Sequence, residues 1–143
     1  MTEVLLPDTE FAARAWARAD PLLSPLLAGR VFFGYPAAQT TAGGAVREPE
    51  LPLMTVAELY EVPDPGPAVA ASRLTWQVWG KDKQQASDVK RALVAALRGL
   101  RGTLLLPGVQ CDGGDQIASV WAPDDEAKLA RYVVDATLQM KAV

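Results

Sequence analysis

The fold of this chain is decided by residues 73–100, which read RLTWQVWGKDKQQASDVKRALVAALRGL. The stretch from about Ser72 to Trp79 alternates as a β-strand does, and each of its faces carries an aromatic side chain, Trp76 on one and Trp79 on the other. Large apolar side chains on both faces favour a central strand that is covered on each side. The alternative for Trp79 is an exposed position at an interface with another protein.

An amphipathic helix is predicted over about residues 83–98. Asp82 is a favourable N-cap residue, and Gln85 follows three residues later, where its side chain can accept a hydrogen bond from the backbone N–H of the cap residue. Gly99 and Gly102 end the helix. Apolar residues recur at helical spacing and predict one buried face, made by Ala86, Val89, Leu93, Ala96, Leu97 and Leu100.

The flanking sequence predicts a second helix and further strands. An N-terminal helix is capped by Asp8 or Thr9 and ends near Ala19. Pro107 interrupts one of the predicted strands, which is therefore broken or lies at a sheet edge. The strands are expected at residues 31–35, 53–61, 103–111, 116–121 and 132–141, and the second of them can pair with residues 72–79 as a long hairpin.

Two segments rich in Pro and Gly, Pro36–Pro52 and Val62–Ala68, are predicted to be long loops. Together these elements indicate an α/β (α+β) fold with a single mixed, mainly antiparallel sheet. The major helix at about residues 83–98 and the N-terminal helix pack on this sheet, and the long loops project from it. No repeat is present, so residues 1–143 are expected to form one domain.

The composition argues against most enzyme classes. The 143 residues include no histidine, which removes the commonest general base and the commonest transition-metal ligand. The single cysteine, Cys111, therefore has no imidazole to activate it, and the acids at residues 124–126 lack the spacing of a calcium loop. We expect no catalytic residue, no metal and no cofactor. No apolar run approaches the roughly 20 residues that cross a bilayer, so no membrane contact is expected either.

Charge is distributed unevenly along the chain. Residues 81–101 hold six basic and two acidic residues, a local charge of +4, whereas the formal net charge of the whole chain is -3 and the remainder therefore carries -7. Such a division can orient a contact between acidic and basic surfaces; an ordinary solvated helix face is the alternative. Specific nucleic-acid binding is not expected, because the chain is acidic overall and holds no recognised nucleic-acid motif.

Two stretches carry a resemblance to a known family. Residues 74–82, LTWQVWGKD, followed by the apolar positions of the helix at 86, 89, 92 and 93, resemble the core signature of tail-terminator proteins of long-tailed (siphovirus-like) bacteriophages. Residues 123–125, PDD, and 130–138, ARYVVDATL, are similar to the closing segment of that family. The order of the predicted elements also agrees, and the resemblance spans roughly residues 11–138.

The resemblance implies a structural role in the neck of a virion, reached by assembly in the host cytoplasm. Members of the family form a ring, typically of six subunits, on the head-proximal end of the tail tube. The ring ends tube polymerisation and offers a surface for joining to the head. The implied partners are other copies of the chain, the tail tube protein and a head-tail connector or neck protein, while DNA passes through the lumen without specific binding.

Both predicted loops are candidates for contacts in such an assembly, because long loops can become ordered on a partner. The polar side chains expected to contact neighbouring subunits are Arg47, Glu48, Lys81, Asp82 and Arg131. Ordinary surface charge is the alternative interpretation of each. Two other functions stay open: a head-completion or neck adaptor that binds the portal side, and a small-ligand-binding or enzymatic α/β domain, which a deep pocket would favour.

Overall fold

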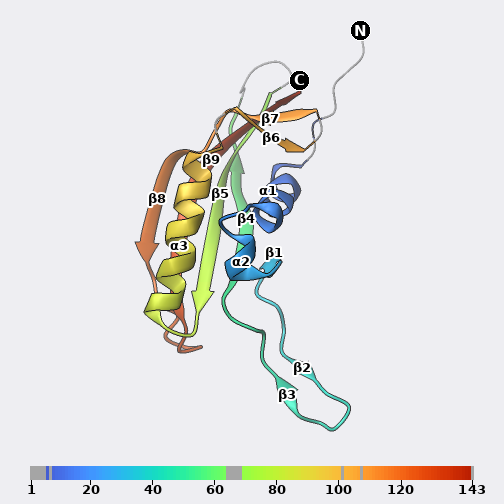
Figure 1. Ribbon diagram of the computed structural model, residues 1–143, viewed down its shortest axis with the longest axis vertical. Helices are drawn as coiled ribbons and strands as arrows, with labels where there is room; N and C mark the ends of the chain where they lie inside the picture. Colours follow the sequence, from blue (N-terminus) through green and yellow to red (C-terminus); the bar gives the residue numbers. More distant parts are fainter. Residues whose placement is uncertain (1–5, 7, 64–68, 101, 107, 143) are drawn as a thin grey trace.

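The computed structural model describes residues 6, 8–63, 69–100, 102–106 and 108–142. It contains a twisted sheet with helices packed on one face, and a thin extension that projects away from the sheet (Figure 1). The helices are α1 (Thr9–Ala19), α2 (Ser24–Leu27) and α3 (Lys83–Arg98). The strands are β1 (Val31–Phe32), β2 (Gln39–Thr40), β3 (Val46–Arg47), β4 (Leu53–Glu61), β5 (Val69–Gly80), β6 (Thr103–Leu106), β7 (Val109–Cys111), β8 (Asp115–Trp121) and β9 (Ala130–Ala142).

Seven of these strands form one sheet in the order β1-β4-β5-β9-β7-β6, with β8 also paired to β9. The pairing of β1 with β4 is parallel, and all other pairings in this sheet are antiparallel. The predicted mixed, mainly antiparallel sheet is therefore confirmed. The expected hairpin between β4 and β5 is also present, with Val56 opposite Trp76 and Leu53 opposite Trp79.

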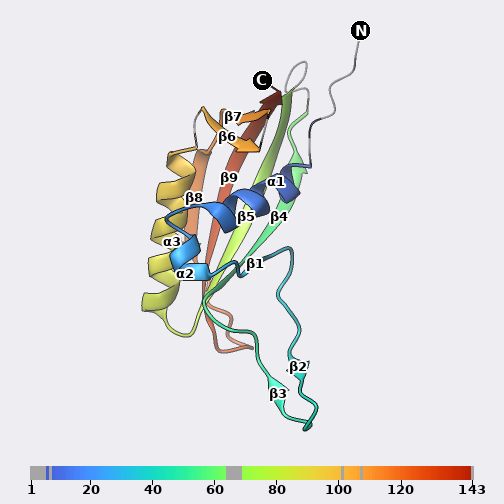
Figure 2. The same ribbon diagram turned by 45° about the vertical axis from the view of Figure 1, so that its right-hand side comes forward.

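The strand around Trp76 is central, as its two apolar faces predicted. β5 pairs with β4 on one side and along its whole length with β9 on the other. Trp76 is fully buried and lies opposite Val134 of β9. Helices α1, α2 and α3 supply the other side of this core through residues that include Trp16, Leu27 and Leu93. In the described part of the chain, no helix covers the opposite face of the sheet (Figure 2).

Both long helices begin at the predicted caps. The carboxylate of Asp8 accepts hydrogen bonds from the backbone of Glu10 and Phe11, so Asp8 and not Thr9 is the N-cap of α1. Asp82 caps α3 by accepting from the backbone N–H of Gln85 at 2.8 Å.

The reciprocal bond of the α3 cap differs from the prediction. Gln85 accepts from the backbone N–H of Lys81, at 2.9 Å, and not from that of the cap residue. Asp82 is extended, with φ -147° and ψ 171°, and the N–H within reach of the Gln85 side chain is that of the preceding residue.

Three sequence predictions need correction. First, β1 ends at Phe32 and not at Tyr35, because the following aromatic rings leave the strand to pack elsewhere: Phe33 against Phe11, and Tyr35 against Trp79. Second, the segment Pro36–Pro52 is not a loop throughout, since β2 and β3 pair within it. Third, the last strand is longer than expected and runs over Ala130–Ala142.

The predicted strand at residues 103–111 is indeed broken, into β6 and β7. In the other predicted loop, Val62–Ala68, residues 64–68 lie outside the described part of the chain.

Candidate assembly surfaces

The most prominent surface feature is an arm, residues 36–50, which projects from the edge of the sheet where β1 meets β4 (Figure 1). Within it, Gln39 of β2 lies opposite Arg47 of β3, and Thr40 lies opposite Val46. The tip is closed by Thr41, whose hydroxyl accepts from the backbone N–H of Ala45 at 3.2 Å. All residues from 37 to 48 are exposed, including the apolar Val46 at 66%. The arm therefore places two predicted contact residues, Arg47 and Glu48, well away from the core.

The base of the arm is fixed by aromatic packing on the open face of the sheet. The ring of Tyr35, just before the arm, meets the ring of Trp79 edge to face, with centroids 4.8 Å apart. Trp79 keeps only 6% of its surface exposed, so the alternative of an exposed Trp79 is wrong for the isolated chain. Burial raises the pKa of Tyr35, and the negative charges of Glu48 and Asp124 raise it further. Residues of the arm, of the end of β5 and of the turn before β9 therefore all lie near Tyr35.

Arg131 also contacts the ring of Trp79. Its guanidinium carbon is 5.0 Å from the centroid of the Trp79 ring. Its Nε donates to the carbonyl of Ala122 at 2.8 Å, and its Nη1 donates to Oε1 of Gln77 at 3.3 Å. Much of the hydrogen-bonding capacity of Arg131 is therefore used inside one chain, where it ties the β8–β9 turn to the sheet.

The remaining predicted contact residues, Lys81 and Asp82, form the turn between β5 and α3. The Asp82 carboxylate is occupied as the helix cap, whereas the Lys81 side chain is exposed. Both residues line a shallow depression of about 400 Å³ between α2 and the start of α3, together with Leu26 and Pro52. The structure thus brings Trp79 and Arg131 into contact and leaves Lys81 and Asp82 at a separate site.

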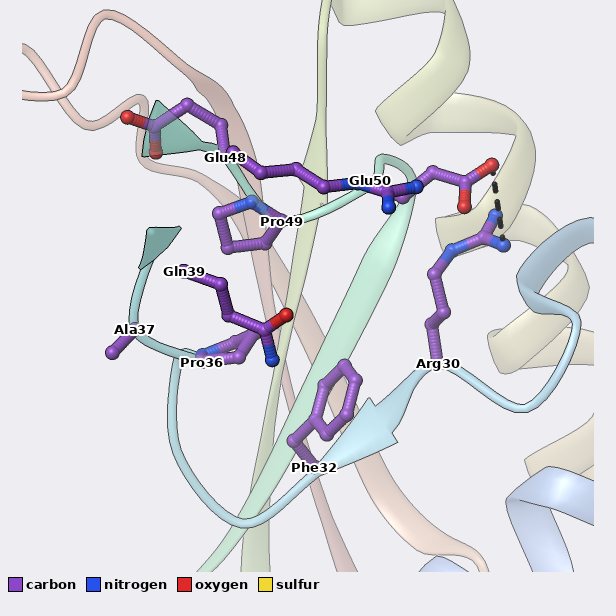
Figure 3. A pocket seen from close by; sticks show the side chains of 9 residues that line it. Arg30, Phe32, Pro36, Ala37, Gln39, Glu48, Pro49 and Glu50 are labelled. Carbon is purple, nitrogen blue, oxygen red and sulfur yellow. Dashed lines mark ion pairs between the residues drawn. The ribbon is translucent and has the colours of Figure 1, made fainter. Parts of the chain in front are cut away.

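A small groove lies between the two limbs of the arm, with a volume of about 240 Å³. Phe32 and Pro36 supply apolar walls, and Gln39 lies beside them (Figure 3). At one end, Arg30 forms an ion pair with Glu50, Nη1 to Oε1 3.9 Å, and its Nε donates to the carbonyl of Pro52 at 2.8 Å. These bonds fix the limb that returns to β4, so the groove is part of the arm's support.

A second surface, which we call the basic edge, lies on the side of the molecule away from the arm. The sequence indicated its charged helix but not the strand beside that helix. We use this name for the cations Lys83, Lys90, Arg91 and Arg98 of α3 together with the adjacent strand β8. A groove of about 370 Å³ runs between helix and strand, lined by Lys90, Arg91, Val94, Ala95, Arg98 and Ser119. The charge of the helix was apparent from the sequence, but its alignment along a strand was not, because that alignment depends on tertiary packing.

Aromatic residues of the sheet hold two of these cations in place. The ammonium of Lys83 lies 4.8 Å from the ring centroid of Trp121, and that of Lys90 lies 5.0 Å from the centroid of Tyr132. The two rings are themselves in contact, with centroids 4.9 Å apart. Cation–π contacts of this kind fix the orientation of long side chains without neutralising their charge. The basic edge is therefore preorganised.

The described residues offer little for chemistry. Among them, no group of three or more His, Cys, Asp and Glu side chains is placed to hold a metal ion. The Cys111 thiol is buried, and this burial raises its pKa, so the reactive thiolate is disfavoured. In the part of the chain that the structure covers, no helix is long and apolar enough to cross a membrane.

Comparison with known proteins gives a similarity of fold. No protein-family model matches the sequence, and no curated protein matches it. Among solved structures, a chain of the virion of a native gene transfer agent (GTA) particle is similar, with a TM-score of 0.56 and 14% sequence identity. The similarity covers 94% of this chain and 95% of that chain. At this identity the match establishes a shared fold, and the two chains share it over nearly their whole lengths.

Proposed function

We propose that this chain is a structural protein of a virion and acts by binding other proteins, without catalysis. The observation that carries this proposal is the similarity of fold to a chain of a gene transfer agent virion, which covers 94% of this chain and 95% of that chain. The composition supports it, because a chain without histidine lacks the commonest general base and has no imidazole to activate the buried Cys111.

Within the virion, we propose the role of a tail terminator. The chain would form a ring, typically of six copies, on the head-proximal end of the tail tube, end tube polymerisation and provide the surface for joining to the head. The resemblance of residues 74–82 and 130–138 to that family supports this role. The exposed arm supports it as well, because a projecting segment offers a neighbouring subunit a contact that the compact sheet does not.

The test is native mass spectrometry and negative-stain imaging of the purified protein over a range of concentrations. We expect closed rings with a central hole, and these rings should cap isolated tail tubes at one end. Added in excess during polymerisation, the protein should shorten the tubes that form. A protein that stays monomeric and binds portal complexes but not tubes would contradict the terminator role and indicate a neck adaptor instead.

A further inference from the structure

The arm and the basic edge lie at opposite edges of the same sheet. The arm leaves where β1 meets β4, whereas β8 lies on the far side of β9, beside α3, which packs over β5 and β9 (Figure 1). We propose that the arm of one copy binds in the groove between α3 and β8 of a second copy. This inference rests on the proposed self-assembly and names the two surfaces that would make it.

Between its base and its tip, the arm has few contacts that would hold it in one conformation. Its strands β2 and β3 share two residue pairs, and the residues that form them are exposed on all sides. An isolated two-stranded hairpin is marginally stable in water, and ordering a segment of this length costs conformational entropy. Contact with a second chain would offset that cost.

The basic edge offers the kind of surface that such an arm fits. β8 pairs on one side with β9, and no described strand pairs with its other side. Its apolar residues are open, with Val120 60% exposed and Trp121 37% exposed. A strand edge with free backbone groups binds an extended segment by main-chain hydrogen bonds. Ser119, which lines the groove, is paired with the core residue Val134, so Val120 lies on the other face of the sheet. An arm paired with β8 as an added strand has side chains on both faces, and the exposed Val46 can lie beside Val120 on the face away from α3.

Charge favours the same pairing. The arm carries one cation, Arg47 of β3, and two acids after it, Glu48 and Glu50. Glu50 forms an ion pair with Arg30 of the same chain, so Glu48 is the acid that the arm presents to a neighbour. The groove of the basic edge presents Lys90 and Arg98, while the third cation in its wall, Arg91, is neutralised by Asp88 at 2.7 Å. Opposite charges across an interface steer association and select its register.

The arrangement also has the symmetry that a ring requires. The two surfaces differ from each other, so the contact is heterologous, and a pair of copies keeps one free arm and one free basic edge for further neighbours. Such contacts build a closed ring when the rotation between copies closes and a filament when it does not. A two-fold dimer would use the same surface on both chains and would leave neither surface free for growth.

Charge reversal on each surface tests the inference in the full-length protein. One variant carries Glu48→Lys, and the other carries Lys90→Glu and Arg98→Glu. We expect each variant alone to self-associate at least about tenfold more weakly than the unmodified protein in analytical ultracentrifugation. An equimolar mixture of the two should assemble again, because reversed arms then meet reversed edges and native arms meet native edges. Native mass spectrometry of that mixture should show the two chains in equal number in every complex.

The exposed Lys128, which lies on neither surface, supplies the control Lys128→Glu, whose self-association should stay within about twofold of the unmodified protein. Thermal unfolding of every variant checks that the fold is kept. If the unmodified protein itself does not self-associate, the proposed ring fails. If it does, but either charge-reversal variant assembles normally or the mixture does not recover, the arm-to-edge contact alone is overturned. The arm-to-edge contact would also be overturned if the arm bound the tail tube and the rings formed without any contact from the arm.

Discussion

The guanidinium of Arg131 lies 5.0 Å from the ring centroid of Trp79 and at the same time donates to the carbonyl of Ala122 at 2.8 Å. These two contacts connect the start of β9 with the end of β5 and with the turn that follows β8. Tyr35 covers the Trp79 ring as well, at the base of the arm. One arginine and one tryptophan therefore join segments that are distant in the sequence.

Replacing Arg131 by Met should destabilise the isolated chain. The substitution keeps an apolar stem beside Trp79 but removes the charged hydrogen bond to Ala122 and the weaker one to Gln77. We expect a loss of about 2 kcal/mol in the free energy of unfolding, measured with urea. The matched control is Arg91→Met, since Arg91 is exposed and, among the described residues, pairs with Asp88 alone, and it should change stability by less than about 0.5 kcal/mol. Equal effects of the two substitutions would contradict the role assigned to Arg131.

Gly80 is required by the close approach of β5 to α3. A Cβ atom at this position would lie 2.7 Å from the backbone nitrogen of Ala86, and backbone cannot move aside as a flexible side chain does. Gly80→Ala should therefore cost about 1–3 kcal/mol in thermal or urea unfolding. Gly34→Ala is the control, because nothing lies within 4 Å of a Cβ there, and it should cause no loss. Similar melting temperatures for both variants would argue against this packing.

Asp82 was predicted both as a helix cap and as a contact between subunits, and substitutions separate the two roles. Asp82→Ala removes the acceptor for the N–H of Gln85 and should cost about 1 kcal/mol in urea unfolding. Asp82→Asn keeps the cap without the charge and should be nearly as stable as the unmodified protein.

If the Asp82 carboxylate also contacts a neighbour, the Asn variant will assemble more weakly although it folds normally. Asp125→Ala, at an exposed turn residue, serves as the control for stability. Full stability of the Ala variant would refute the capping role.

Cys111 should make stability depend on pH on the alkaline side. Burial raises the pKa of its thiol above the ordinary value of 9.0, and the folded state therefore holds this proton more tightly than the unfolded state does. The resulting stabilisation is complete below the unfolded-state pKa and is lost as the pH rises through the folded-state pKa. The free energy of unfolding should accordingly fall above pH 9, and it should fall less steeply in Cys111→Ala.

Tyr35, whose pKa is also raised, contributes in the same direction, so a smaller decline will persist in the alanine variant. Thiol reagents provide an independent measurement. The native protein at pH 8 should react with them far more slowly than the urea-unfolded protein does. Rapid reaction of the folded protein would show that Cys111 is accessible.

Local patterns predicted the central part of the fold well. The helix at residues 83–98 has both ends where Asp82 and Gly99 placed them, since capping and helical periodicity are properties of neighbouring residues. The central position of β5 followed from apolar residues on both of its faces. The pairing of β4 with β5 was also as expected, because a strand and the next strand along the chain commonly form a hairpin.

What the sequence did not reveal depends on contacts between distant residues. The strands of the arm, Gln39–Thr40 and Val46–Arg47, are too short to show any alternation, and a turn at Thr41 holds them. Trp79 is buried because Tyr35 and Arg131 reach it from other segments. No local pattern could have shown that Trp121 and Tyr132 would support the cations of α3.

The position of β9 has a consequence for how the chain folds. This strand pairs along its length with β5 and on its other side with β8 and β7, so the centre of the sheet is completed by residues 130–142. The register joins Val69 to Lys141, a pairing of high contact order, which makes folding slow. Until β9 docks, the backbone groups along one edge of β5 are unpaired, and this edge can pair with a strand of another nascent chain. The yield of native protein should therefore fall as the concentration of unfinished chains rises during synthesis.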